Sequence, residues 1–149
     1  MTGLDGIGVR VEQRGADDEA WGNALPILYE VRHALQRLSK TGETTVIDLH
    51  ALPFGPGDED HLLALLGRGE VEARIDALGP TQVRETGFPG VWLVDHRNAQ
   101  NERLTLHIEI ASIPDILRSQ SEDVADALLR LDARIDSAAG NPYPSQMTA

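Results

Sequence analysis

The sequence predicts one α+β domain in which a mostly antiparallel sheet carries helices packed on one face. Four consecutive segments after Gly69 alternate apolar and polar residues, as half-buried strands do. Two longer segments repeat apolar residues at helical spacing. The 149 residues suit a single domain, and 41% hydrophobic with 25% charged residues is the balance of a folded globular protein.

The first helix is predicted from about Asn23 to Lys40, because Pro26 falls in the tolerated first turn and Gly42 stops the pattern. A short helix follows from Asp58, whose acidic first turn suits the helix dipole, to Gly67 as an αL cap. The apolar stripe expected to face the core of the first helix consists of Leu28, Val31, Leu35 and Leu38.

The last helix is predicted from Ser121, as its N-cap, to about Ala138, after a short helical turn at residues 114–117. Gly140 and Pro142 end it. Amphipathic helices more often face their own core than a partner, so we expect this stripe to be buried too. It consists of Val124, Leu128, Leu131 and Ile135, with Leu129 alongside.

Strands are expected wherever polar and apolar residues alternate or β-branched residues gather between Gly, Pro or Asn clusters. Two isolated strands are predicted at residues 7–13 and 44–52. The segments "EVEARIDAL", "TQVRETGF", "VWLVDH" and "RLTLHIEIA" follow one another and predict an antiparallel meander. We therefore expect a domain over residues 1–140 and a mobile tail at 141–149.

Composition excludes several classes of function. The chain has no cysteine, which excludes disulfides, thiolate metal sites and a cysteine nucleophile. With 24 acidic and 13 basic residues the net charge is −11, so nucleic acid and anionic lipid are poor partners. Neither a signal peptide nor an apolar run of about 18 residues is recognisable, so a cytoplasmic location without membrane insertion is expected.

Catalytic and metal-binding signals are weak. None of the five histidines forms an HExxH or HxH pattern. One set of histidines and carboxylates could bind nickel or perform acid–base chemistry if neighbouring strands brought it together. The simpler interpretation is a solvated sheet face that carries cross-strand charge pairs. The set consists of Glu85, Asp95, His96, His107 and Glu109. We predict no catalytic residue, resident metal or cofactor. Two alternatives stay open. One is a metal carrier using His50, His61, His96 or His107 with carboxylates, and the other is a small hydrolase that joins His96 or His107 to a nucleophile such as Ser112 or to a general-base carboxylate.

Both phenylalanines lie at bends rich in proline and glycine, "ALPFGPGDED" and "ETGFPGVWLVDH". A phosphate-binding loop is a poor explanation of the first bend, because the lysine of such loops is missing and acidic residues occupy the helix start. Either the rings staple the bends onto the core, or they lie exposed and form a docking surface. The acidic residues form either a solvated surface or a site for a basic peptide: Asp17, Asp18, Glu19, Asp58, Glu59, Asp60, Glu122 and Asp123.

Three blocks taken together resemble the HupH/HyaF/HoxQ family of hydrogenase expression and formation proteins. They are "DLHALPFGPGDEDHLLALLGRGEVEARI", "ETGFPGVWLVDH" and "IEIASIPDILRSQSEDV", and the resemblance runs from about Ile47 to Val124. It implies a non-enzymatic cytoplasmic chaperone for [NiFe] hydrogenase maturation that binds the small-subunit precursor before export.

The resemblance also bears on partners. The precursor of such a small subunit carries a twin-arginine leader, which the acidic surface could attract. Many members resemble two tandem copies of this domain, so a single copy implies a possible homodimer, and another maturation factor could join. The family motif supplies the predicted partner-binding residues: Phe54, Gly55, Pro56, Gly57, Phe88, Pro89, Gly90, Trp92 and Gln120.

Overall fold

The computed structural model describes residues 22–140, and the chain divides into two compact units between Pro114 and Asp115. The strand predicted at residues 7–13 and the tail predicted at 141–149 lie outside the described residues. The first unit contains α2 (Ala24–Thr41), β1 (Thr45–Asp48), η1 (Leu49–Ala51), α3 (Asp58–Leu66), β2 (Glu72–Asp76), β3 (Pro80–Glu85), β4 (Val91–Arg97) and β5 (Arg103–Ile110). The second unit contains η2 (Asp115–Leu117) and α4 (Ser121–Ala138).

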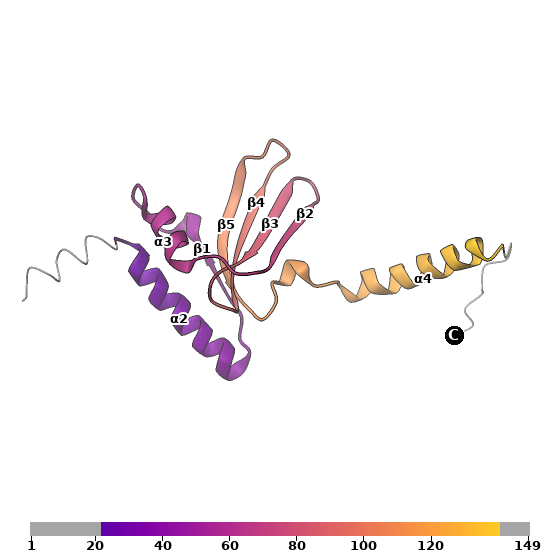
Figure 1. The fold of residues 1–149 in the computed structure, drawn as a ribbon, viewed down its shortest axis with the longest axis horizontal. Helices are drawn as coiled ribbons and strands as arrows, with labels where there is room; N and C mark the ends of the chain where they lie inside the picture. The colour runs from indigo at the N-terminus through magenta and orange to yellow at the C-terminus, as the bar shows by residue number, and fades with distance from the viewer. Residues whose placement is uncertain (1–21, 141–149) are drawn as a thin grey trace, which may run out of the picture. The chain divides into compact units, whose positions relative to one another are not determined.

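The five strands form one antiparallel sheet in the order β1-β5-β4-β3-β2 (Figure 1). The meander predicted from four alternating segments is confirmed as β2 to β5. β1 pairs with β5 at the free edge of the meander, with Thr45 opposite Ile110 and Asp48 opposite His107. The chain is therefore an α+β protein, as the sequence predicted.

β1 is shorter than the predicted strand at residues 44–52. It ends at Asp48, whose carboxylate accepts a hydrogen bond from the backbone N–H of His50 at 2.9 Å. An aspartate that bonds two residues ahead in this way turns the chain out of a strand. The 3-10 turn η1 follows and places Leu49 in the core.

α2 and α3 cover one face of the sheet (Figure 1). α2 was predicted within one residue at each end, but its buried face is rotated from the predicted stripe. The fully inward positions are Ala24, Ile27, Val31 and Ala34. Leu28, Leu35 and Leu38 lie at the edge of the contact and are only partly buried. Two alanines on the inward face let the helix backbone approach the sheet closely, which leaves the leucines to flank it.

α3 begins at Asp58 as predicted and buries Leu62 and Leu66. Gly67 follows its last residue and its N–H bonds the carbonyl of Leu63 at 3.1 Å. The predicted αL cap is wrong in detail, because Gly67 has a φ of 69° but a ψ of −162°. This extended ψ sends the chain directly toward β2.

α4 corrects two predictions. Ser121 is the first helical residue and Gln120 occupies the N-cap position, with an extended ψ of 150°. The helix buries none of its side chains, and its large apolar residues are all more than half exposed: Val124, Leu128, Leu129, Leu131 and Ile135. Within the second unit, the stripe that was predicted to face a core is therefore exposed. Among residues 22–140, no helix is long and apolar enough to cross a membrane.

Candidate partner-binding surface

The bend between β3 and β4 is a tight turn at residues 88–91. Pro89 and Gly90 occupy its centre, the Val91 N–H bonds the Phe88 carbonyl at 3.0 Å, and Gly90 has a φ of +91°. These are the features of a type II turn, which needs a residue tolerant of positive φ at its third position. The buried Thr86 hydroxyl accepts a hydrogen bond from the Phe88 N–H at 3.2 Å. The Phe88 backbone is therefore fixed on both sides.

The same bend is bonded to the end of α3. The Gly87 N–H donates to the carbonyl of Leu66 at 2.8 Å, which satisfies one of the carbonyls left free at the helix end. A Cβ on Gly87 would lie 3.1 Å from that oxygen, so the close approach favours glycine. α3 and the Phe88 bend therefore form one rigid corner.

A shallow apolar groove of about 350 Å³ lies between α2 and this corner. The Phe88 side chain is 49% exposed, in contrast to the core side chains around it. Arg32 supplies the polar part of the rim, and the remaining lining is aliphatic: Leu28, Val31, Leu35 and Leu66. We call this surface the α2 groove.

Sequence analysis missed most of the α2 groove, because Leu28 and Leu35 were assigned to the core. One signal was present in the sequence. Ile27 and Leu28 are adjacent, and one α-helix cannot turn two consecutive side chains equally toward a single sheet. The apolar surface of α2 is therefore wider than the sheet needs, and its excess lines the groove.

Trp92 differs from Phe88. It is 6% exposed, and its indole Nε1 donates to the Ala111 carbonyl at 3.0 Å. A satisfied and buried indole is part of the core. The Trp92 indole therefore ties β4 to the residue that follows β5, and its ring offers a partner almost no surface in this conformation.

The other bend is organised by Asp58. Its carboxylate accepts hydrogen bonds from the Gly55 N–H at 2.7 Å and from the Asn23 side chain at 2.9 Å. The Gly55 hydrogen bond, followed by that from Asn23, holds the pKa of Asp58 below its ordinary value. Phe54 is partly buried and packs against the core, as the staple interpretation expected. Gly57 turns into α3 with a φ of 84°.

The predicted partner residues thus fall in three places. The Phe54 bend adjoins the start of α3 and the Phe88 bend adjoins its end, about 13 Å apart along a nine-residue helix. Only Phe88 of the predicted set lines the α2 groove. Gln120 belongs to the second unit, where it is exposed before α4. The described contacts do not unite the two phenylalanine bends into one patch.

The predicted histidine and carboxylate set is divided by the sheet. His96 and His107 lie on one face with ring centroids 5.6 Å apart, and His96 Nδ1 shares a hydrogen bond with the Thr81 hydroxyl at 2.9 Å. Asp95 points to the opposite face, since neighbouring residues of a strand alternate. The solvated-face interpretation is wrong for Glu109, which is buried. Within the described part of the chain, no three histidine or acidic side chains are grouped to hold a metal ion.

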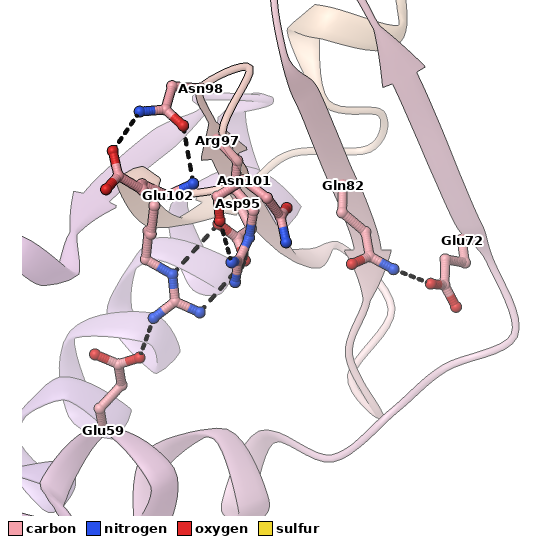
Figure 2. A network of polar contacts seen from close by, with 9 residues as sticks. Glu59, Glu72, Gln82, Asp95, Arg97, Asn98, Asn101 and Glu102 are labelled. Atoms are coloured by element: carbon pink, nitrogen blue, oxygen red, sulfur yellow. Dashed lines mark hydrogen bonds and ion pairs between the residues drawn. The ribbon is translucent and has the colours of Figure 1, made fainter.

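Asp95 instead belongs to an ion-pair network that joins three elements (Figure 2). Its carboxylate contacts Arg97 at 3.1 Å and Arg103 at 3.3 Å, and Arg103 also contacts Glu59 of α3 at 2.7 Å. The network therefore ties the start of α3 to β4 and β5. Since Glu59 and Asp58 both have partners within the fold, the acidic start of α3 is not simply an open site for a basic peptide.

Comparison with known proteins identifies the family. Residues 22–138 match the family described as HupH hydrogenase expression protein, C-terminal conserved region, and the chain belongs to that family. It is 31% identical over 111 residues to the hydrogenase expression/formation protein HoxQ of Azotobacter vinelandii, covering 73% of this chain and 39% of that protein. It is 27% identical over 109 residues to the hydrogenase-1 operon protein HyaF of Escherichia coli K12. The match thus spans about two fifths of these relatives.

A solved structure agrees with this assignment. The hydrogenase expression protein HupH from Thiobacillus denitrificans superimposes with a TM-score of 0.74 and is 46% identical in sequence. The match covers 78% of this chain and 97% of that one. The resemblance stated from three sequence blocks is therefore confirmed.

Proposed function

We propose that this chain is a non-enzymatic accessory factor for [NiFe] hydrogenase maturation, a chaperone that binds the small-subunit precursor in the cytoplasm before export. Its family supports the hydrogenase role, because the relatives are named hydrogenase expression or formation proteins. The α2 groove supports the binding role. A half-exposed phenylalanine on a rigid turn beside an aliphatic surface is the kind of patch that mediates protein contacts.

The groove is suited to binding without large rearrangement. The Phe88 backbone is hydrogen-bonded to Thr86 and Val91, so little backbone entropy is lost when a partner covers the ring. The side chains of Leu28 and Leu35 are partly buried and pack against the core. The proposed mechanism is therefore shielding: the groove covers an apolar segment of the incompletely folded precursor until its own subunit contacts form.

Charge selects which part of the precursor we expect in the groove. Arg32 at the rim disfavours the twin arginines of a leader and favours a segment whose apolar side chains adjoin a carboxylate. Asp58 and Glu59, candidates for attracting the leader, already bond Asn23 and Arg103. We therefore place the proposed contact in the body of the precursor and not in its arginine pair.

The test is capture of separately expressed small-subunit and large-subunit precursors by the tagged chain. Phe88→Ala and Leu28→Ser are the groove variants. Leu104→Ala is the matched control, because Leu104 is 57% exposed on β5, at the other end of the strand from Ile110. We expect capture of the small-subunit precursor by the native chain and by Leu104→Ala, and at least roughly tenfold weaker capture by the groove variants.

Three further results decide the details. Capture that survives deletion of the leader supports contact with the precursor body, whereas capture by the leader alone would contradict it. Equal loss in Phe88→Ala and Leu104→Ala would move the contact away from the groove. Capture of neither precursor would contradict the proposed client. Another maturation factor, used as a second bait, would then test whether it is the partner. We also propose that the chain acts as a homodimer, for which α4 supplies a specific surface.

A further inference from the structure

We propose that α4 pairs with α4 of a second copy in an antiparallel two-helix contact, so that the second unit is a dimerisation element. This inference concerns α4 alone and does not depend on the α2 groove or on the hydrogenase client. Its starting point is exposure. Val124, Leu128, Leu131 and Ile135 are between 51% and 57% exposed, on a helix that buries no side chain.

The spacing of these side chains defines a seam and not a scattered set. Steps of four, three and four residues keep one stripe facing the same way along the helix, the pattern of the inner positions of a coiled coil. Extending the same pattern by one position at each end reaches Ser121 and Ala138, the first and last residues of α4. The seam therefore runs the full length of the helix, about 27 Å.

The order of side chains along the seam is symmetric. From either end the seam reads as a small residue, a β-branched residue and then leucine: Ser121, Val124 and Leu128 from the start, Ala138, Ile135 and Leu131 from the end. In an antiparallel pair, each position meets its counterpart from the other end. Ser121 then faces Ala138 of the second copy, Val124 faces Ile135, and Leu128 faces Leu131, so every layer matches in one register. A second copy of α4 is therefore the partner whose order of side chains matches this seam.

The charges favour the antiparallel direction. Glu122 and Asp123 lie in the first turn, and both arginines of the helix lie in its second half. Arg130 already bonds Asp126 of its own helix at 2.7 Å. On the same flank of the seam, Asp123 of one copy lies beside Arg134 of the other when the helices run in opposite directions. A parallel pair would instead bring the two acidic first turns together and align the helix dipoles unfavourably.

The size of the contact predicts a reversible dimer. A five-turn helix pair lies at or below the lower end of the roughly 1,200–2,000 Å² that stable interfaces bury. We therefore expect the mass in sedimentation equilibrium to rise from 16.2 kDa toward twice that value as the concentration of the full chain rises. A mass that stays at 16.2 kDa over the whole range would overturn the proposal.

Two neighbouring leucines give a matched test. Leu128 lies at the middle of the seam, whereas Leu129 lies outside it and is slightly more exposed. We expect Leu128→Glu to raise the dissociation constant at least roughly tenfold and Leu129→Glu to leave it nearly unchanged. Equal effects of both would overturn the seam. Far-UV circular dichroism checks that α4 stays helical. A second variant, Ala125→Gln, adds bulk at the seam margin while every seam residue is kept, and it should also weaken the dimer.

The direction of the pair is tested separately. Asp123→Arg and Arg134→Asp should each weaken the dimer, and combining them in one chain should restore it, because the cross-copy pair is rebuilt with reversed charges. The chain has no cysteine, so Ser121→Cys and Ala138→Cys each introduce a unique thiol. Oxidation of a mixture of the two variants should give the crosslinked heterodimer, and either variant alone should crosslink poorly. Efficient crosslinking of each variant with itself would show a parallel pair and contradict the proposal.

Discussion

The Trp92 indole and the Ala111 carbonyl are joined by a hydrogen bond of 3.0 Å across nineteen residues of sequence. The Ala111 N–H in turn bonds the Gly90 carbonyl at 2.9 Å. Ala111 therefore bonds both the turn that presents Phe88 and the indole ring of Trp92. Because Phe88 is half-exposed and Trp92 is buried, the two aromatic residues should respond differently to mutation.

We expect Trp92→Ala to destabilise the fold by about 3–5 kcal/mol, because it empties a large core site. Trp92→Phe keeps an aromatic ring but leaves the buried Ala111 carbonyl without its donor, for which about 1–3 kcal/mol is expected. Phe88→Ala, at a half-exposed position, should cost about 1 kcal/mol or less. Urea unfolding measures all three. A Trp92→Phe variant as stable as the native chain would contradict the structural role of the indole.

The sequence was a good guide to elements and a poor guide to which aromatic residue is exposed. The meander and the bounds of α2, α3 and α4 followed from periodicity and from glycine and proline positions. Residues 91–94 of β4 are buried on both faces of the sheet, so alternation along the strand gives no information on burial there. Phe88 and Trp92 lie four residues apart and have opposite exposures. The Phe88 N–H donates to the Thr86 hydroxyl, and the Trp92 indole donates to the carbonyl of Ala111, which lies nineteen residues away. Such contacts between distant segments are not encoded in local spacing.

The helices show a similar limit. α2 and α4 carry comparable stripes in the sequence, yet α2 buries residues such as Ile27 and α4 buries none. Period alone defines an apolar face, and it does not say which surface covers that face. In α4 the order of side chains along the stripe is also symmetric, and this symmetry is the basis of the proposed pairing.

Gly90→Ala should destabilise the chain more than Gly42→Ala. Gly90 and Gly42 both have positive φ, +91° and +75°. Alanine in such a backbone conformation destabilises the fold by about 1 kcal/mol at either position. A Cβ on Gly42 meets no atom within 4 Å, whereas on Gly90 it meets the side chains of Leu35 and Leu38 at 3.4 Å. We therefore expect about 1–2 kcal/mol for Gly90→Ala, together with weaker client capture because Leu35 lines the α2 groove. Equal destabilisation by the two variants would show that only φ matters.

Asp58→Asn should lower the melting temperature and loosen the Phe54 bend. The carboxylate accepts from both Gly55 and Asn23, and an amide at this position cannot accept as strongly at both sites. Since its pKa is held below the ordinary 3.8, the stabilisation from Asp58 is present above pH 3.8 and is lost as the pH falls through the lowered value. Amide hydrogen exchange at Gly55 reports the bend directly. Unchanged exchange and melting in Asp58→Asn would disprove the anchoring role.

His107 should make the fold weaken on mild acidification. Burial, and then the charge of His96, lower the pKa of His107 below its ordinary 6.5. The unfolded chain therefore takes up this proton more readily than the folded chain, so the contribution to stability is intact above pH 6.5 and is lost as the pH falls from 6.5 through the lowered pKa. His107→Gln should flatten the decrease in unfolding free energy between neutral pH and about pH 5. His33→Gln, at an exposed position of α2, is the matched control for the loss of a histidine. Asp58 and Glu72 titrate below 3.8 and 4.5, so they do not contribute in this window. A slope that is the same in His107→Gln and in the native chain would assign the acid sensitivity to another group.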